Sequence, residues 1–288
     1  MEETIAADSL QILLVGVFWM LLTTLFAWKM GYYYLPKQDV QEKLPFRVVL
    51  VSFAIVILLA MLIIPIISIL AIYLYKGKID TSPKTITLIN YVSVMIGSLI
   101  LGVFQFFLSN KERELIWGKL FGPKISFDKT LKDILMGILT WFISYPVLIV
   151  VSRLVSLSFE HYGIEVLVDQ IAVSHVRAAL SSPLIFAIVA ISVIIFVPVI
   201  EEFLFRGCLQ TWLKGKLGVK NAIVVSSLIF AGFHFSVAQE LGNVEILTTL
   251  FFLSLFLGFI YERQQSLLAS ITLHSFFNGL SVLFIALS

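Results

Sequence analysis

The sequence is poor in charge and has a single cysteine, and each shortage excludes a class of protein. Of the 288 residues, 59% are hydrophobic and only 13% are charged, whereas a soluble domain of this size needs far more charge to cover its surface. One cysteine, Cys208, leaves no partner for an internal disulfide or a cysteine metal cluster. A net charge of +2 is too small to indicate a nucleic-acid partner. Lipid is therefore the expected surrounding of most of the chain.

What the sequence has in quantity is long apolar runs. A bilayer core about 30 Å thick is crossed by roughly 20 apolar residues in a helix, and a backbone in lipid must satisfy its own hydrogen bonds. The runs are Leu10–Trp28, Phe46–Tyr75, Ile86–Leu108, Ile134–Leu157, Leu184–Glu202, Ala222–Val237, Ile246–Tyr261 and Ser266–Leu287. We therefore expect an all-α, polytopic membrane protein with about eight transmembrane helices.

The basic residues predict an orientation in the membrane. Fifteen of the 20 lysines and arginines lie in the linkers after the first, third, fifth and seventh runs, and five lie on the opposite side. Because basic linkers stay in the cytoplasm, we expect an integral protein, of the cell membrane, with both termini outside. The segment 158–182 would then lie outside, as a short interfacial helix or a plain loop.

Ionisable residues inside membrane spans are costly and usually functional, and here they cluster in the last hundred residues. This predicts two regions. Residues 1–182 form an N-terminal membrane region of about four helices and an interfacial segment, and residues 183–288 form a core of about four helices. His161 and His175 fall in the outer segment, where we expect them to be solvated and without a role.

The first polar group in the core stands at the end of the fifth run. Glu201 and Glu202 are adjacent and point about 100° apart on a helix, whereas Glu202 and Arg206 are four residues apart and share a face. The spacing predicts an ion pair between Glu202 and Arg206 and leaves Glu201 aimed elsewhere. Pro198 removes a helix hydrogen bond just before them and should loosen the backbone. The alternative is that these charges only mark the cytoplasmic end of a span.

Two further polar groups lie in the sixth and eighth runs. His234 is alone in an apolar helix, and His274 and Asn278 are four residues apart on one face. Either group could simply hydrogen-bond neighbouring helices together. At a rise of about 1.5 Å per residue, however, all of them and Glu201 fall in the cytoplasmic half of the membrane. A shared, water-accessible cavity that opens to the cytoplasm explains this common depth.

These three segments resemble the CAAX prenyl endopeptidase and bacteriocin-processing (CPBP, or ABI) family. The family pattern is Glu-Glu-x-x-x-Arg, then Phe-x-x-x-His, then His-x-x-x-Asn on successive transmembrane helices. The matching residues here are Glu201, Glu202 and Arg206, then Phe230 and His234, then His274 and Asn278. The resemblance covers about residues 183–288. Many members have Thr-Gly where this chain has Gln264-Gln265, which is a loop position.

The resemblance implies an intramembrane endopeptidase that cleaves a hydrophobic or lipidated peptide or protein, as in CAAX-type processing. By this similarity Glu201 and His234 activate a water molecule, His274 and Asn278 stabilise the oxyanion, and the pair Glu202–Arg206 supports the first helix. Donors fixed in a dry site stabilise developing charge better than water does.

No cofactor is expected, although Glu201, His234 and His274 have the composition of a zinc site with two histidines and one glutamate. The metal-free mechanism is favoured because no helix carries the paired histidines that zinc peptidases often use. Two other functions stay open. One is a non-catalytic immunity or scaffold protein of the same fold, and the other is a transporter, against which the lack of internal repeats counts.

Overall fold

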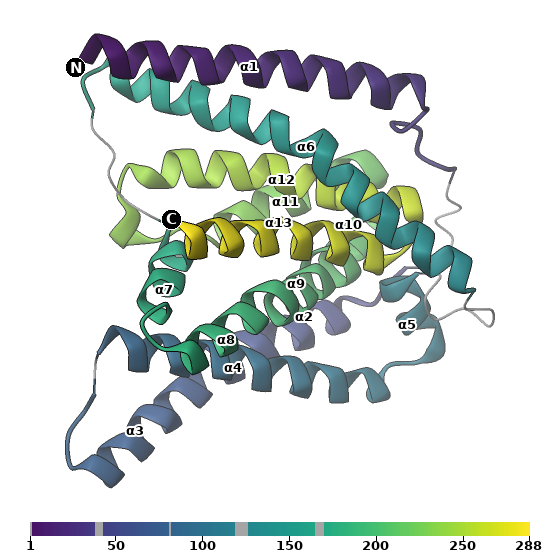
Figure 1. Cartoon of the computed structure of the whole chain (residues 1–288). Coiled ribbons are helices and arrows are strands. Elements are labelled where there is room, and N and C mark those ends of the chain that lie inside the picture. Colours follow the sequence, from purple (N-terminus) through teal and green to yellow (C-terminus); the bar gives the residue numbers. More distant parts are fainter. Residues whose placement is uncertain (1, 38–42, 81, 119–125, 165–169) are drawn as a thin grey trace.

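The computed structural model describes residues 2–37, 43–80, 82–118, 126–164 and 170–288. Every regular element within these ranges is a helix, and the one strand-like pairing found there is an isolated bridge between Gly118 and Ser266. The expected all-α class is confirmed (Figure 1).

The helices of the first 180 residues vary widely in length. In chain order they are α1 (Glu2–Lys29), α2 (Phe46–Ala54), η1 (Ile55–Ile63), α3 (Ile64–Lys76), α4 (Pro83–Phe104), η2 (Gln105–Phe107), α5 (Asn110–Trp117), α6 (Phe127–His161) and α7 (Ile171–Ala179). The short helix α7 lies in the segment that was expected to be an interfacial helix or a loop, and it is a helix.

The C-terminal helices follow without a long break. They are α8 (Pro183–Ile191), η4 (Ser192–Phe196), α9 (Val197–Glu202), η5 (Phe203–Gln210), α10 (Thr211–Leu217), α11 (Val219–Gly232), η6 (Val237–Gln239), α12 (Gly242–Gln264) and α13 (Leu267–Leu287). The elements α8 to α10 form one continuous helical stretch in which η4 and η5 are π-helical.

Within the described residues, seven helical stretches are long and apolar enough to cross a membrane. They are Leu10–Lys29, Phe46–Lys76, Pro83–Phe107, Phe127–His161, Pro183–Leu217, Gly242–Gln264 and Leu267–Leu287. The expected sixth span is instead the shorter apolar helix α11, which has 14 residues and ends before His234. At about 1.5 Å per residue it is about 21 Å long, which is less than a bilayer core. The chain is an integral, polytopic membrane protein.

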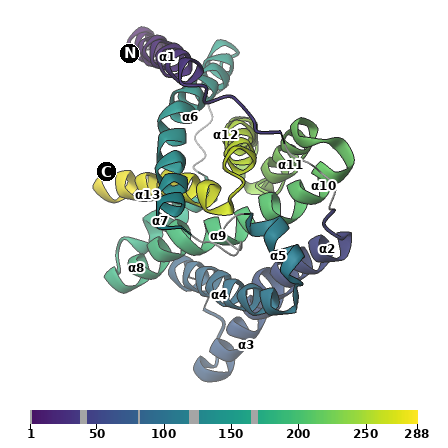
Figure 2. The same cartoon turned by 90° about the vertical axis from the view of Figure 1, so that its right-hand side faces the viewer.

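Helix α12 lies in the middle of the C-terminal bundle (Figure 2). It packs against α6, α11 and α13, and its buried residues include Leu253, Leu257 and Ile260. Helices α6 and α13 touch closely at Gly137, where an added Cβ would lie 2.7 Å from the carbonyl oxygen of Ala269. Small residues permit such close contact of helices in membranes. The N-terminal helix α6 is thus part of the wall of the C-terminal bundle.

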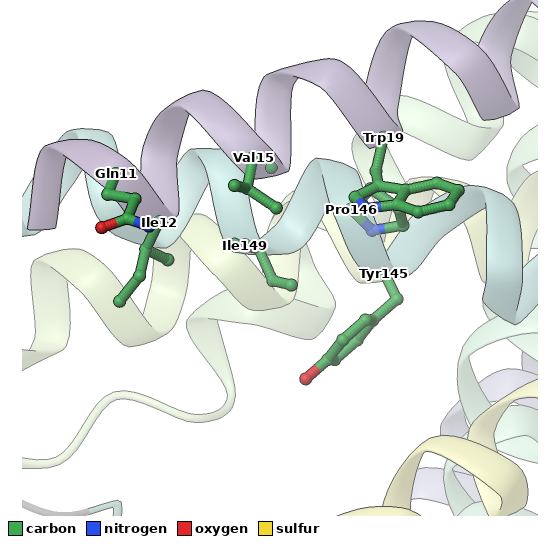
Figure 3. Close-up of a pocket in the computed structure, with 8 residues that line it drawn as sticks. Gln11, Ile12, Val15, Trp19, Tyr145, Pro146 and Ile149 are labelled. Carbon is green, nitrogen blue, oxygen red and sulfur yellow. The ribbon is translucent and has the colours of Figure 1, made fainter. Parts of the chain in front are cut away.

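Helix α1 lies along α6 at the edge of the molecule (Figure 1). A groove of about 580 Å³ separates parts of the two helices (Figure 3). Its lining residues are Gln11, Ile12, Val15, Gly16, Trp19, Tyr145, Pro146 and Ile149. None of the predicted site residues lines this groove, so it is separate from the candidate site.

The turn between α12 and α13 explains why a glycine is common in it. Gln265 has φ 50° and ψ 46°, which is the left-handed conformation that glycine adopts at little cost. The Thr-Gly found in many proteins of similar pattern would place its glycine at this position. Here a glutamine adopts the same conformation, so the replacement keeps the turn and places no site residue elsewhere.

Candidate active site

The two glutamates lie on α9, a short α-helical piece between two π-helical segments. Pro198 is in the first turn of α9, and just before it the N–H of Val197 bonds to the carbonyl of Ser192, five residues back. Proline lacks an N–H and its ring clashes with the carbonyl four residues before it, so a wider turn suits this position. The expected loosening of the backbone before Glu201 is observed.

Glu202 and Arg206 form a buried ion pair, as their spacing predicts. Arg206 Nη1 donates to Glu202 Oε1 at 2.9 Å, and the two side chains are 1% and 0% exposed. The other terminal nitrogen of Arg206 donates to the hydroxyl of Ser254 at 2.7 Å. The guanidinium carbon also lies 4.5 Å from the centre of the Phe230 ring. The pair therefore links α9, α11 and α12.

The same carboxylate holds the histidine of α13. His274 Nδ1 donates to Glu202 Oε1 at 2.8 Å, and His274 is 5% exposed. Because Nδ1 is committed to this bond, only Nε2 is free to face the cavity. Glu202 thus acts on the site indirectly, by orienting the ring of His274.

Glu201 faces the two histidines from the other side of the site. Its Oε1 lies 3.9 Å from His234 Nε2, and its Oε2 lies 3.7 Å from His274 Nε2. These separations are too long for direct hydrogen bonds and suit a bridging water or reacting group. Glu201 is 23% exposed and His234 is 31% exposed, so both are accessible from the cavity.

The protonation of His234 follows from its partner. Its Nδ1 lies 2.9 Å from the carbonyl oxygen of Phe230. A carbonyl can only accept, so Nδ1 carries the hydrogen, and Nε2 faces Glu201 without a hydrogen whenever the ring is neutral. For His274, the hydrogen bond to Glu202 fixes only that Nδ1 is a donor. Its Nε2 can accept when the ring is neutral or donate when the ring is charged.

Asn278 lies one helical turn after His274 and lines the same cavity. Its Nδ2 donates to the carbonyl of Val193 at 2.9 Å. Val193 belongs to the π-helical segment η4. One hydrogen of the Asn278 amide therefore orients the side chain, and the second is available to another acceptor.

His234 is the second residue after the end of α11, in the connection to α12. Asn243, at the start of α12, holds this connection. Its Oδ1 accepts from the N–H of Ser236 at 3.0 Å, and its Nδ2 donates to the carbonyls of Ser236 and Glu240 at 2.7 and 2.9 Å. The loop that carries His234 is thus fixed by a side chain that is 5% exposed.

A cavity of about 720 Å³ joins the predicted site residues. Its lining includes Glu201, His234, His274 and Asn278, together with Phe230. Glu202 and Arg206 lie behind this wall and do not line it. The structure therefore brings together the four residues predicted to act on a substrate and the two predicted to support them, whereas their catalytic roles stay predictions.

Comparison with known proteins adds an independent observation. Residues 170–280 match the family model described as Rce1-like, type II CAAX prenyl endopeptidase. This segment is similar to the Rce1-like family. Curated proteins and solved structures gave no significant match. The matched segment contains every predicted site residue from Glu201 to Asn278.

The Rce1-like segment also contains α7, which lies before the expected boundary at residue 183. In the structure α7 supplies part of the cavity wall, including His175 and Val176. His175 is half-buried and its ring packs edge-on against Tyr91 of α4 at 5.9 Å. The prediction that His175 is solvated is therefore wrong, because α7 folds against the bundle and does not lie apart from it.

The cavity is lined by residues near the start of α12 and the end of α13, and α13 ends on the side of the molecule where α1 begins (Figure 1). Lining residues at that end are Ser152, Gln170, Gly242, Glu245 and Ile285. The sequence predicted termini outside and a cavity open to the cytoplasm. Both statements stay predictions.

A metal site was the alternative to the metal-free prediction. Two imidazole nitrogens and a carboxylate have a suitable composition for zinc. Among the described residues, however, no group of three or more histidine, cysteine, aspartate or glutamate side chains is arranged to hold a metal ion. We therefore derive no step through a metal.

Proposed function

We propose that this chain is an intramembrane peptidase that hydrolyses a peptide bond in a hydrophobic or lipidated peptide or protein. The observation that carries the proposal is the position of Glu201, which faces the Nε2 atoms of His234 and His274 in one cavity. The apolar walls suit an apolar substrate. The lipid bilayer is the second partner, through the exposed apolar helices.

In this mechanism a water molecule binds between Glu201 and His234. The Glu201 carboxylate takes a proton from the water as the water oxygen attacks the scissile carbonyl carbon. Unprotonated Nε2 of His234 accepts the other hydrogen of that water and orients it. When the C–N bond breaks, Glu201 returns the proton to the leaving amine. Atoms and charge balance without a co-reactant.

The oxyanion of the tetrahedral intermediate requires donors. Asn278 offers the amide hydrogen that Val193 does not accept. His274 can donate from Nε2 only when both ring nitrogens are protonated, and each nitrogen then faces a carboxylate, Glu202 at 2.8 Å and Glu201 at 3.7 Å. The two proposed donors lie one helical turn apart on α13, so both can point at the same oxygen atom.

The test is a cleavage assay with purified protein in neutral detergent. A farnesylated peptide with a C-terminal CAAX sequence and its unlipidated form are incubated with the enzyme, and the products are identified by mass spectrometry. We expect one new C-terminus, in amounts unchanged by a chelator of divalent metals. Cleavage that stops with the chelator and returns with added zinc would favour the metal-dependent alternative. No cleavage of any hydrophobic peptide would contradict the proposal.

We further propose that both termini lie outside the cell membrane. The support is the excess of basic residues in the linkers at the opposite end. In intact cells an impermeant maleimide should label Ser288→Cys, at the end of α13. Asn221→Cys, an exposed position at the start of α11, should be labelled only after permeabilisation, and the buried Cys208 contributes no background. The reverse pattern would overturn this orientation.

A further inference from the structure

The proposed mechanism makes no use of Glu245, an acidic residue in the first turn of α12. It lines the same cavity as Glu201, at the end formed with Ser152 and Gln170. Two hydroxyl groups of α6 donate to its carboxylate. Ser152 Oγ lies 2.5 Å from Oε1, and Ser156 Oγ lies 3.3 Å from Oε2. Both oxygens of Glu245 are thus held in place from one side.

The negative charge of Glu245 has no counter-ion among the described residues. Within the described residues its hydrogen bonds come from two neutral serines. His175, which lines the same cavity, is not a cation at neutral pH, because burial lowers the pKa of its ring below the usual value. A glutamine could keep both contacts, because its oxygen accepts from one hydroxyl group while its Nε2 donates to the oxygen of the other. The structural role of Glu245 therefore does not require its charge.

A charge is costly within a membrane-spanning helix and is normally balanced by a partner. The cavity supplies the place for such a partner, since the Glu245 carboxylate is part of its wall and is partly exposed. The serines occupy the side toward α6, which leaves the cavity side open. A cation that completes this site would have to come from a molecule bound in the cavity.

The distance between Glu245 and the catalytic residues can be taken along α12. Ser254 marks the level of the site, because its hydroxyl accepts from Arg206, which pairs with Glu202. Nine residues separate Glu245 from Ser254, or about 13 Å along a helix axis at about 1.5 Å per residue. An extended peptide rises about 3.3 Å per residue. Three or four residues of a bound peptide would therefore span this length.

The wall between the two ends is mostly apolar. Residues that line it include Val173, Val176, Ile246, Leu250, Leu253 and Phe277. A peptide with apolar side chains would bury them there, while its cationic group would meet Glu245 at the far end. The cavity thus combines one apolar stretch with one anionic end.

We propose that Glu245 is a specificity-determining residue that binds a cationic group of the peptide substrate, an ammonium or guanidinium, three or four residues from the scissile bond. The inference rests on the proposed peptidase function for its substrate class, but the binding site itself does not depend on turnover. Ser152 and Ser156 are positioning residues that direct the carboxylate into the cavity.

Binding is tested first, without cleavage. Protein with the substitution Glu201→Gln, in neutral detergent, is titrated with fluorescent apolar peptides that carry a lysine, a norleucine or a glutamate at positions two to five from the centre. We expect the lysine peptide to bind most tightly at one spacing, and this preference to disappear when Glu245→Gln is added. Equal binding of lysine and norleucine peptides at every spacing would overturn the proposal.

Cleavage is then compared in protein that retains Glu201. For the best lysine peptide, Glu245→Gln should lower kcat/KM by about 10- to 100-fold, the range for loss of a hydrogen bond to a charged group, and should leave the norleucine peptide unaffected. Glu240→Gln is the matched control, since it removes an exposed carboxylate five residues away that does not line the cavity. Glu245→Lys should invert the preference toward the glutamate peptide.

The two experiments separate the inference from the function on which it rests. Glu245-dependent binding of the lysine peptide without any cleavage would support the binding site and contradict the peptidase. Cleavage with no dependence on peptide charge would support the peptidase and contradict the role of Glu245. A loss of activity toward all peptides in Glu245→Gln, with an unchanged melting temperature, would also overturn a specificity role.

Discussion

The variant Glu201→Gln should lose peptide cleavage by about 10³-fold in kcat/KM, within the range that general base catalysis contributes. Glutamine keeps the size of the side chain and one acceptor oxygen but cannot take a proton from water. Glu201 makes no hydrogen bond within the described residues, and its nearest partners are the histidine nitrogens at 3.7 and 3.9 Å. The measurement is the rate of product formation under single-turnover conditions.

The stability of the Glu201 variant decides whether a loss of activity reflects lost catalysis or unfolding. Because Glu201 is partly exposed and lies outside the buried pair, its variant should melt within about one degree of the unaltered protein. Glu240→Gln removes the same charge from an exposed loop position and should keep full activity. Normal turnover by Glu201→Gln would contradict the proposed mechanism. Binding of substrate by an inactive, folded variant would support it.

The relation among Glu201, Glu202 and Arg206 was predictable because it depends on one helical turn. Residues four apart share a face whatever surrounds the helix, and the observed Arg206–Glu202 bond of 2.9 Å follows that rule. The apolar runs were predictable for an equally local reason, since length and composition alone set a membrane span. Seven of the eight runs became stretches of that kind.

The position of His234 was not predictable from depth along ideal helices. That arithmetic placed His234 inside a sixth span, whereas α11 ends at Gly232 and His234 lies in a loop held by Asn243. The apolar residues of the segment 158–182 predicted a short interfacial helix or a loop but not its neighbour. The contact of His175 with Tyr91 shows that α7 packs on α4. The first difference is a helix end followed by a loop that a side chain seven residues farther on holds. The second is a contact between segments far apart in the chain, which no local pattern encodes.

Charged residues at the ends of apolar helices did not indicate which of them are buried or line the cavity. Glu262 stands at the end of α12, where charge is ordinary for a membrane helix. In the structure it is 1% exposed and accepts from Gln210 at 2.9 Å and Lys214 at 3.0 Å. Glu245, at the other end of the same helix, lines the cavity. The sequence shows that both residues flank an apolar run but not which neighbours surround them.

The buried ion pair leads to the largest expected effect on stability. Arg206→Met keeps an unbranched apolar stem and leaves the Glu202 carboxylate buried without its cation. Breaking a buried pair on one side costs about 3 to 5 kcal/mol, which corresponds to a fall of about 10 °C in melting temperature for a chain of this size. Thermal unfolding in neutral detergent measures it.

Arg47→Met is the matched control for Arg206→Met. Arg47 also binds a carboxylate, Glu112, at 3.1 Å, but its side chain is 78% exposed. Solvent screens such a pair, so its loss should cost at most about 1 kcal/mol. The double variant Glu202→Gln with Arg206→Met removes both buried charges and should recover part of the lost stability. It should remain slow in cleavage, because the ring of His274 would have lost the carboxylate that orients it. Equal losses from Arg206→Met and Arg47→Met would contradict a structural role for the buried pair.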